Sequence, residues 1–353
     1  MIRFTIPALV LSFVFCGAAQ ARCTVTVSDF GTLASGEKVR AYRFDNGDLG
    51  VTVLSLGGIL HDIDAPDRNG RRINVVRNLE TLAAYEQRDN FSSLIGRFAN
   101  RLGGGGITLD GQFYALPGNA RGVTMHGGAK SFGSRIWSVT SLPSNTCGVE
   151  LTLVSPDDDN GFPGALGVTV RYTLAKNRLT LAYTARTTKP TVINLTHHAY
   201  FNLAGSGDVY GQTLQLHAGH HLPVDKLRLP TGELAPVEGA KYDWRKPRPI
   251  GDGGQALDDA FALDGKLAAI LSDPKSGRTL TVSTTEPGLV VYTAGSFDGS
   301  LIDADHHPLP AGAGIALETQ HFPDSPHHDT FPTTVLHPGD TWHSETTYDF
   351  SVK

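Results

Sequence analysis

The chain has 353 residues and a net charge of −5 at neutral pH, from 30 basic and 35 acidic side chains. This mild acidity, without a basic stripe, argues against nucleic-acid binding. Hydrophobic residues make up 40% of the chain, which excludes general disorder and supplies a sizeable core. The 40 glycines and 20 prolines favour many short strands joined by tight turns.

The first 21 residues have the features of a secretory signal peptide. A basic residue precedes an apolar run at residues 6–15, and residues 19–21 read Ala-Gln-Ala, an A-x-A cleavage site. The apolar run is short for a membrane anchor. Cys16 could suggest a lipoprotein, but the residues around it fit ordinary cleavage better. We therefore predict cleavage after Ala21 and secretion, in the style of a Gram-negative periplasmic protein.

Segments of alternating apolar and polar residues dominate the rest of the chain and predict half-buried strands. In chain order they lie at residues 42–44, 50–54, 149–153, 167–174, 178–185, 280–284, 289–293 and 342–350. Lys176-Asn177 predicts a hairpin turn between the fourth and fifth of these strands. Residues 286–288 predict a second hairpin between the next two strands, and one short helix is expected at residues 78–85.

No linker rich in proline, serine or glycine divides the chain. The four glycines at residues 103–106 are flanked by patterned sequence and predict a tight loop. We therefore expect residues 22–353 to form a single all-β domain, a large antiparallel β-sandwich with few short helices.

Two cysteines remain after the predicted cleavage, Cys23 and Cys147. An exported pair can form a disulfide. The alternative is two unpaired thiols, and the sequence leaves both possibilities open.

Four clusters of polar residues could carry chemistry, at residues 96–102, 125–128, 194–203 and 317–324. The third contains His198 and the fourth contains Glu318. One imidazole and one carboxylate are sufficient to open a cyclic hemiacetal, because a base must take the O1 proton while an acid protonates the ring oxygen. This reaction needs no metal, nucleotide or covalent intermediate.

The four clusters resemble the aldose 1-epimerase (galactose mutarotase) family. They read Gly-Arg-Phe-Ala-Asn-Arg-Leu, His-Gly-Gly, Asn-Leu-Thr-His-His-Ala-Tyr-Phe-Asn-Leu and Leu-Glu-Thr-Gln-His-Phe-Pro-Asp, in the order of the family. Weaker matches at residues 222–225, 230–233, 242–245 and 257–261 extend the resemblance from about residue 40 to the C-terminus. The resemblance implies the family's β-supersandwich and interconversion of the α and β anomers of free aldohexoses such as glucose and galactose, without a cofactor.

The resemblance also implies roles for single residues. His198 would be the catalytic acid and Glu318 the base. Substrate-binding positions fall on Asn100, Arg101, His126, Tyr200, Asp258 and Glu286. Hydrogen bonds from such residues to sugar hydroxyls would fix the orientation of the ring.

Three positions depart from the family pattern. His197 stands where the family commonly has Asn, and Asp259-Ala260 replaces a His-Asn pair beside Asp258. Glu286 stands where the family has a Gln, so a group that donates and accepts becomes one that only accepts. Glu286 either contacts the sugar or, if its turn has shifted, faces solvent.

Other functions fit the sequence less well. The 14 histidines lack the spacing of a closed zinc site, so we predict no metal site. A hexose-6-phosphate 1-epimerase would need additional basic residues near the sugar's C6 end. A non-catalytic carbohydrate-binding module would need neither His198 nor Glu318. The expected partner is a small sugar, with no nucleic acid and no membrane after cleavage, and the expected assembly is a monomer or weak dimer.

Overall fold

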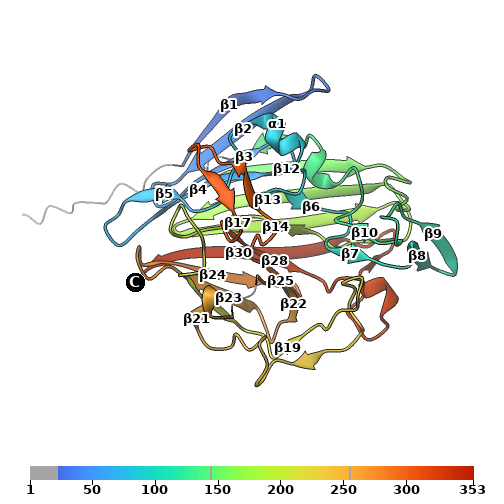
Figure 1. Cartoon of the computed structure of the whole chain (residues 1–353). Coiled ribbons are helices and arrows are strands. Elements are labelled where there is room, and N and C mark those ends of the chain that lie inside the picture. Colours follow the sequence, from blue (N-terminus) through green and yellow to red (C-terminus); the bar gives the residue numbers. More distant parts are fainter. Residues whose placement is uncertain (1–22, 144, 254–255) are drawn as a thin grey trace, which may run out of the picture.

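The computed structural model describes residues 23–143, 145–253 and 256–353 (Figure 1). The predicted signal peptide lies outside these described residues. Three antiparallel sheets of nine, six and five strands dominate the structure. The prediction of an all-β sandwich is therefore confirmed.

The nine-stranded sheet crosses the whole molecule. Its strands, in spatial order, are β11 (Ser138–Ser141), β12 (Cys147–Ser155), β13 (Leu166–Ala175), β14 (Arg178–Thr187), β30 (Trp342–Val352), β24 (Arg278–Thr284), β23 (Leu267–Ser272), β18 (Thr213–Leu216) and β21 (Arg248–Pro249). β13 and β14 form the predicted hairpin, with Lys176 at a φ of 55° in the turn. The C-terminal strand β30 pairs with β14 and β24, and so joins the two halves of the sheet (Figure 1).

The six-stranded sheet is made largely from the C-terminal half of the chain. Its strands, in spatial order, are β17 (Tyr200–Phe201), β28 (Ile315–Gln320), β25 (Gly288–Tyr292), β22 (Asp258–Ala262), β19 (His220–His221) and β20 (Ala235–Pro236).

The predicted hairpin around residues 286–288 is wrong, because β24 and β25 belong to different sheets. A hairpin requires the two strands to exchange backbone hydrogen bonds, but β24 pairs with β23 and β30, and β25 pairs with β22 and β28. The N–H of Thr285 instead donates to the carbonyl of Glu345 in β30. The segment is therefore a crossover between the two large sheets.

The N-terminal part of the chain forms the five-stranded sheet. It consists of β1 (Thr24–Thr32), β2 (Lys38–Asp45), β3 (Gly50–Leu54), β4 (Leu60–Pro66) and β5 (Arg72–Asn74), in that order. The remaining strands pair two by two: β6 (Leu94–Ile95) with β16 (Thr196–His197), β7 (Arg101–Leu102) with β10 (Thr124–Met125), β8 (Gly106–Leu109) with β9 (Gln112–Ala115), β15 (Thr191–Val192) with β29 (Val335–Leu336), and β26 (Asp298–Ile302) with β27 (Pro308–Pro310).

Helical structure in the described residues is limited to α1 (Leu82–Glu86) and the 3₁₀ turns η1 (Phe132–Ser134), η2 (Ile250–Gly253) and η3 (Ser325–His327). The helix predicted at residues 78–85 thus begins four residues late. Thr81 is extended, with a φ of −130°, and its side chain accepts a hydrogen bond from the N–H of Ala84. This N-cap fixes the start of the helix.

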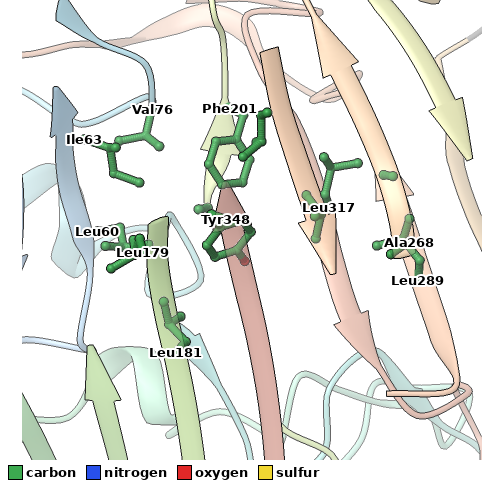
Figure 2. Close-up of a cluster of buried hydrophobic side chains, with 14 of the residues drawn as sticks. Leu60, Ile63, Val76, Leu179, Leu181, Phe201, Ala268, Leu289, Leu317 and Tyr348 are labelled. Carbon is green, nitrogen blue, oxygen red and sulfur yellow. The ribbon is translucent and has the colours of Figure 1, made fainter. Parts of the chain in front are cut away.

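The main core lies where the three sheets meet. Figure 2 shows Leu60 and Ile63 of β4, Leu179 and Leu181 of β14, and Tyr348 of β30 in one apolar cluster with Leu289 and Leu317 of the six-stranded sheet. These side chains are almost completely buried. Burial of apolar surface on this scale supplies the main stabilisation of the fold.

A disulfide joins Cys23, just before β1, to Cys147 at the start of β12, with 5.3 Å between the two Cα atoms. Of the two possibilities that the sequence left open, the structure has the disulfide. It ties the N-terminal sheet to the nine-stranded sheet. No helix in the described residues is long and apolar enough to cross a membrane.

Candidate active site

A cleft opens beside the six-stranded sheet and contains several of the predicted site residues. It is lined by Asn100, Arg101, Val224, Arg228, Pro230, Asp258, Asp259, Ala260, Val290 and Pro323. Its walls combine two guanidinium groups and two carboxylates with apolar side chains. This mixture can both pack against a sugar ring and hydrogen-bond its hydroxyls.

Glu318 lies in β28, where successive side chains point to opposite faces of the sheet. Ile315 and Leu317 enter the core, so Glu318 projects from the other face. Its cross-strand partner Val290 lines the cleft. Strand periodicity therefore places the Glu318 carboxylate on the cleft side of the sheet, where its side chain is only 2% exposed.

The adjacent histidines His197 and His198 have different surroundings. His197 Nε2 donates a hydrogen bond of 3.2 Å to the carbonyl of Gly58, and its ring packs edge-on against Tyr172. Burial lowers the pKa of His197 to about 3, so this ring is neutral. The unusual neighbour of His198 thus has a structural contact of its own.

The ring of His198 packs between two other predicted site residues. Its centroid lies 4.8 Å from that of Tyr200 and 5.5 Å from that of His126. The backbone N–H of His198 donates to the carbonyl of Ser93. These contacts leave the imidazole little freedom to change orientation.

His198 and Glu318 form a close pair, with 3.5 Å between Nε2 and Oε1. Burial raises the pKa of Glu318 to about 8, and the nearby charge of Asp258 adds to this rise while Arg101 opposes it. Burial lowers the pKa of His198 to about 4. Between these two values the pair therefore holds a single proton. Among the described residues, Oε2 of Glu318 has no hydrogen-bond partner.

Asn100 and His126 are joined by two hydrogen bonds, and both have an uncommon backbone conformation. Both have left-handed conformations, with φ of 61° and 48°. The N–H of His126 donates to the carbonyl of Asn100, and the N–H of Asn100 donates to His126 Nδ1 at 3.3 Å. Because burial lowers the pKa of His126 well below its usual value, the ring is neutral and must carry its proton on Nε2.

The position after His126 must be a glycine because the backbone there passes close to that of Gly96. A Cβ atom at this position would lie 2.1 Å from the carbonyl oxygen of Gly96, and the φ of Gly127 is 86°. Only glycine fits such a close approach. The His-Gly-Gly segment can therefore pack directly against the segment that leads to Asn100.

Arg101 and Asp258 face the same cleft without a direct ion pair between them. Arg101 Nη1 donates to Asn100 Oδ1 at 3.2 Å. Burial lowers the pKa of Arg101, an effect that the charge of Asp258 opposes. Asp258 is instead paired with Arg228, at 2.7 Å between Oδ2 and Nη2.

The sequence did not single out Arg228. It lies between Leu227 and Leu229, in the turn that joins two of the weaker matching segments. Asp225 and Lys226 precede it in the same stretch, so its charge does not stand out, and it belongs to no motif.

Comparison with known proteins decides the family. The family model described as aldose 1-epimerase matches residues 40–349. The chain is 37% identical to galactose mutarotase of Rattus norvegicus, over 93% of this chain and 99% of that protein. It is 34% identical to aldose 1-epimerase of Escherichia coli (strain K12), over 87% and 93% of the two chains.

The chain belongs to the aldose 1-epimerase family. Solved structures agree: galactose 1-epimerase from Lactobacillus acidophilus superimposes with a TM-score of 0.83 at 27% identity, covering 93% of this chain and 99% of that chain. A homologue from Caenorhabditis elegans gives a TM-score of 0.81 at 26% identity, with the same coverage.

Three of the predicted substrate-binding residues, His126, Tyr200 and Glu286, do not line the cleft. His126 and Tyr200 pack against His198, whereas Glu286 contacts His321. The side chain of Glu286 is 3% exposed, and Oε2 accepts a hydrogen bond of 2.6 Å from His321 Nδ1. The alternative in which Glu286 faces solvent is therefore wrong. A sugar contact through the second carboxylate oxygen stays a prediction.

The described residues of this epimerase contain no group of three or more His, Cys, Asp or Glu side chains that could hold a metal ion. His327 and His328 instead surround Asp324, whose carboxylate also accepts from the N–H of Gly103. This cluster fastens the glycine loop that follows Arg101.

Proposed function

We propose that this protein interconverts the α and β anomers of free aldohexoses, with Glu318 as the base and His198 as the acid. The observation that carries the proposal is the buried pair at 3.5 Å beside a polar cleft. The family membership and the mutarotase and epimerase relatives support the same reaction.

Ring opening requires two proton transfers on one sugar. Glu318 takes the proton from the O1 hydroxyl, and His198 gives a proton to the ring oxygen O5 as the C1–O5 bond breaks. Rotation about C1–C2 presents the other face of the aldehyde. On reclosure His198 takes back the proton from the C5 hydroxyl and Glu318 returns its proton to O1, which yields the other anomer and restores both residues.

The cycle requires one protonated acid and one ionised base, so the His198–Glu318 pair must hold a single proton. In the unliganded site the higher pKa of Glu318 keeps the proton on the carboxyl. A sugar hydroxyl that donates to the unpartnered Oε2 of Glu318 would stabilise the ionised carboxylate. Substrate binding would thereby favour the state with an ionised Glu318 and a protonated His198.

The remaining predicted residues bind and orient the ring. Asn100, Arg101 and Asp258 line the cleft, while His126 and Tyr200 pack against His198. The Nε2 proton of His126 makes this ring a hydrogen-bond donor. Fixing the ring relative to the acid and base is itself a large part of such a rate enhancement.

The protein acts outside the cytoplasm in this proposal. The signal-peptide pattern of residues 1–21 motivates it, and the Cys23–Cys147 disulfide suits an oxidising compartment such as a periplasm. We propose a monomer or weak dimer that binds only small sugars.

Polarimetry tests the proposed reaction. Wild type should speed the decay of optical rotation of fresh α-D-glucose, whereas His198→Asn and Glu318→Gln should each lose roughly 10²–10⁴-fold in rate. His343→Asn and Glu345→Gln, on the exposed face of β30, are matched controls that should keep full activity. Near-normal rates in either folded site variant would contradict the assignment.

A further inference from the structure

Arg228 lies in a turn that is held by several hydrogen bonds and that borders the cleft. The carboxylate of Asp225 accepts from the N–H groups of Leu227 and Leu229, at 2.7 and 3.0 Å. The backbone N–H of Asp225 donates to the carbonyl of Leu229, and the N–H of Arg228 donates to the carbonyl of Asp225. Arg228 has a φ of 62°. The turn therefore fixes the direction in which the Arg228 side chain leaves the backbone.

The guanidinium of Arg228 contacts both the side chain and the backbone of Asp258. Its Nη2 lies 2.7 Å from the Oδ2 of Asp258 and donates to the backbone carbonyl of Asp258 at 2.5 Å. One nitrogen thus bridges the side chain and the main chain of the same aspartate. This arrangement restricts the rotation of the carboxylate about its side-chain bonds.

Asp258 needs such a restraint because of its position. It is the first residue of β22, and its side chain is 36% exposed. Arg101, across the cleft, is engaged with Asn100. An exposed carboxylate at the start of a strand would otherwise sample several orientations, and ordering it on sugar binding would cost affinity.

We propose that Arg228 is a positioning residue for substrate binding, which holds Asp258 so that its other carboxylate oxygen is ready to accept a sugar hydroxyl. The inference rests on the proposed function, because it takes the ligand of Asp258 to be an aldose. Arg228 acts through Asp258, and its effect should appear in sugar binding and leave the proton transfers intact.

The rival interpretation gives Arg228 a direct ligand. A guanidinium at 46% exposure in a cleft could bind the phosphate of a sugar phosphate. Its charge is already countered by Asp258, and Asp259 lines the same cleft. The lining therefore offers no surplus positive charge for an anion, and the positioning role is favoured.

The test compares Arg228→Leu with Arg228→Lys by polarimetry on glucose. We expect Arg228→Leu to raise KM on the order of tenfold with kcat within about twofold, because a hydrogen bond to a charged group is lost while the acid and base remain. Arg228→Lys should recover much of the affinity, since the contact uses one nitrogen. The matched control is Arg245→Leu, which removes an arginine paired with Asp243 at 2.8 Å away from the cleft lining and should change neither constant.

A set of monodeoxy glucoses distinguishes positioning from a general loss of structure. In wild type, the sugar that lacks the hydroxyl bound by Asp258 should show a raised KM, and Asp258→Ala should abolish that penalty. Arg228→Leu should shrink the penalty for the same sugar alone. An unchanged KM for glucose, a uniform rise for all sugars with a fall in kcat, or a preference for glucose 6-phosphate that Arg228→Leu abolishes would each overturn the proposal.

Failure of the proposed function would be recognised separately. In that case wild type itself would not accelerate mutarotation of any sugar in the set. Calorimetric binding of glucose to wild type and Arg228→Leu then decides the role of Arg228, because weaker binding in the variant supports it and equal or absent binding overturns it.

Discussion

The protonation of the His198–Glu318 pair predicts a specific pH dependence of kcat/KM, the constant that reports the free enzyme. With pKa values of about 4 for His198 and about 8 for Glu318, the pair carries one proton between these limits. Below the lower value both groups are protonated and no base remains. Above the higher value both groups are deprotonated and no acid remains.

These values give the size of the effect. At pH 6 roughly 98% of the pair is singly protonated, so the rate should lie on a plateau. At pH 9 the singly protonated fraction is about a tenth, and kcat/KM should fall by about the same factor. The profile should therefore be a broad bell whose limbs are set by burial of the two groups.

Initial rates of anomer interconversion by polarimetry, at low substrate concentration, measure this profile. The uncatalysed rate is subtracted at each pH, and circular dichroism confirms that the protein remains folded. A rate that keeps rising above pH 8 would show that the reaction needs only an ionised Glu318 and no proton on His198. A rate that is flat across the range would show that neither group is the acid or the base.

Two further predictions concern stability. Replacing both Cys23 and Cys147 with Ser removes a crosslink with a sequence separation of 124. Chain entropy predicts a loss of at most about 5 kcal/mol in the free energy of unfolding. Urea titration measures this loss, and an unchanged midpoint and slope would contradict the prediction. His327 donates to Asp324 and to the carbonyl of Gly106, and the hydrogen bond to Asp324 raises its pKa. The stabilisation from protonated His327 should be complete below the unfolded-state pKa near 6.5 and be lost as pH rises through the folded-state pKa. His327→Asn should therefore lower the free energy of unfolding more at pH 5.5 than at pH 8.5. An equal loss at both pH values would refute this.

The sequence was informative where a local pattern determines the structure. The strands of β13, β14 and β30 were predicted because alternation over eight or more residues marks a half-buried strand. Glu318 was located by the motif resemblance alone, because the sequence predicted no strand at β28, and the structure was needed to assign its face. The motif resemblance located His198, but β16 and β17 have two residues each and show no periodicity that could assign its orientation.

What the sequence could not supply was the pairing of distant segments. Nothing local indicates that the turn carrying Arg228 folds over the start of β22, since that contact consists of an ion pair and a hydrogen bond to a residue 30 positions away. The crossover at Pro287 was mistaken for a hairpin because a turn signal does not state which sheet the next strand will join. The partner of Glu286 was missed for the same reason.

Glu286 is the family departure whose consequences the structure makes testable. Oε2 of Glu286 accepts from His321 Nδ1, and the remaining oxygen is the one that could accept from a sugar. In Glu286→Gln the hydrogen bond from His321 persists without the charge of the carboxylate, so we expect a loss of about 1 kcal/mol in the free energy of unfolding. If the second oxygen contacts sugar, the ratio of kcat/KM for glucose and galactose should also shift by roughly twofold to tenfold. His321→Asn is the matched variant, because it weakens the same hydrogen bond and leaves the carboxylate in place. A shift in the sugar ratio confined to Glu286→Gln would establish the contact, whereas equal destabilisation of both variants with an unchanged ratio would show that Glu286 serves only to hold His321.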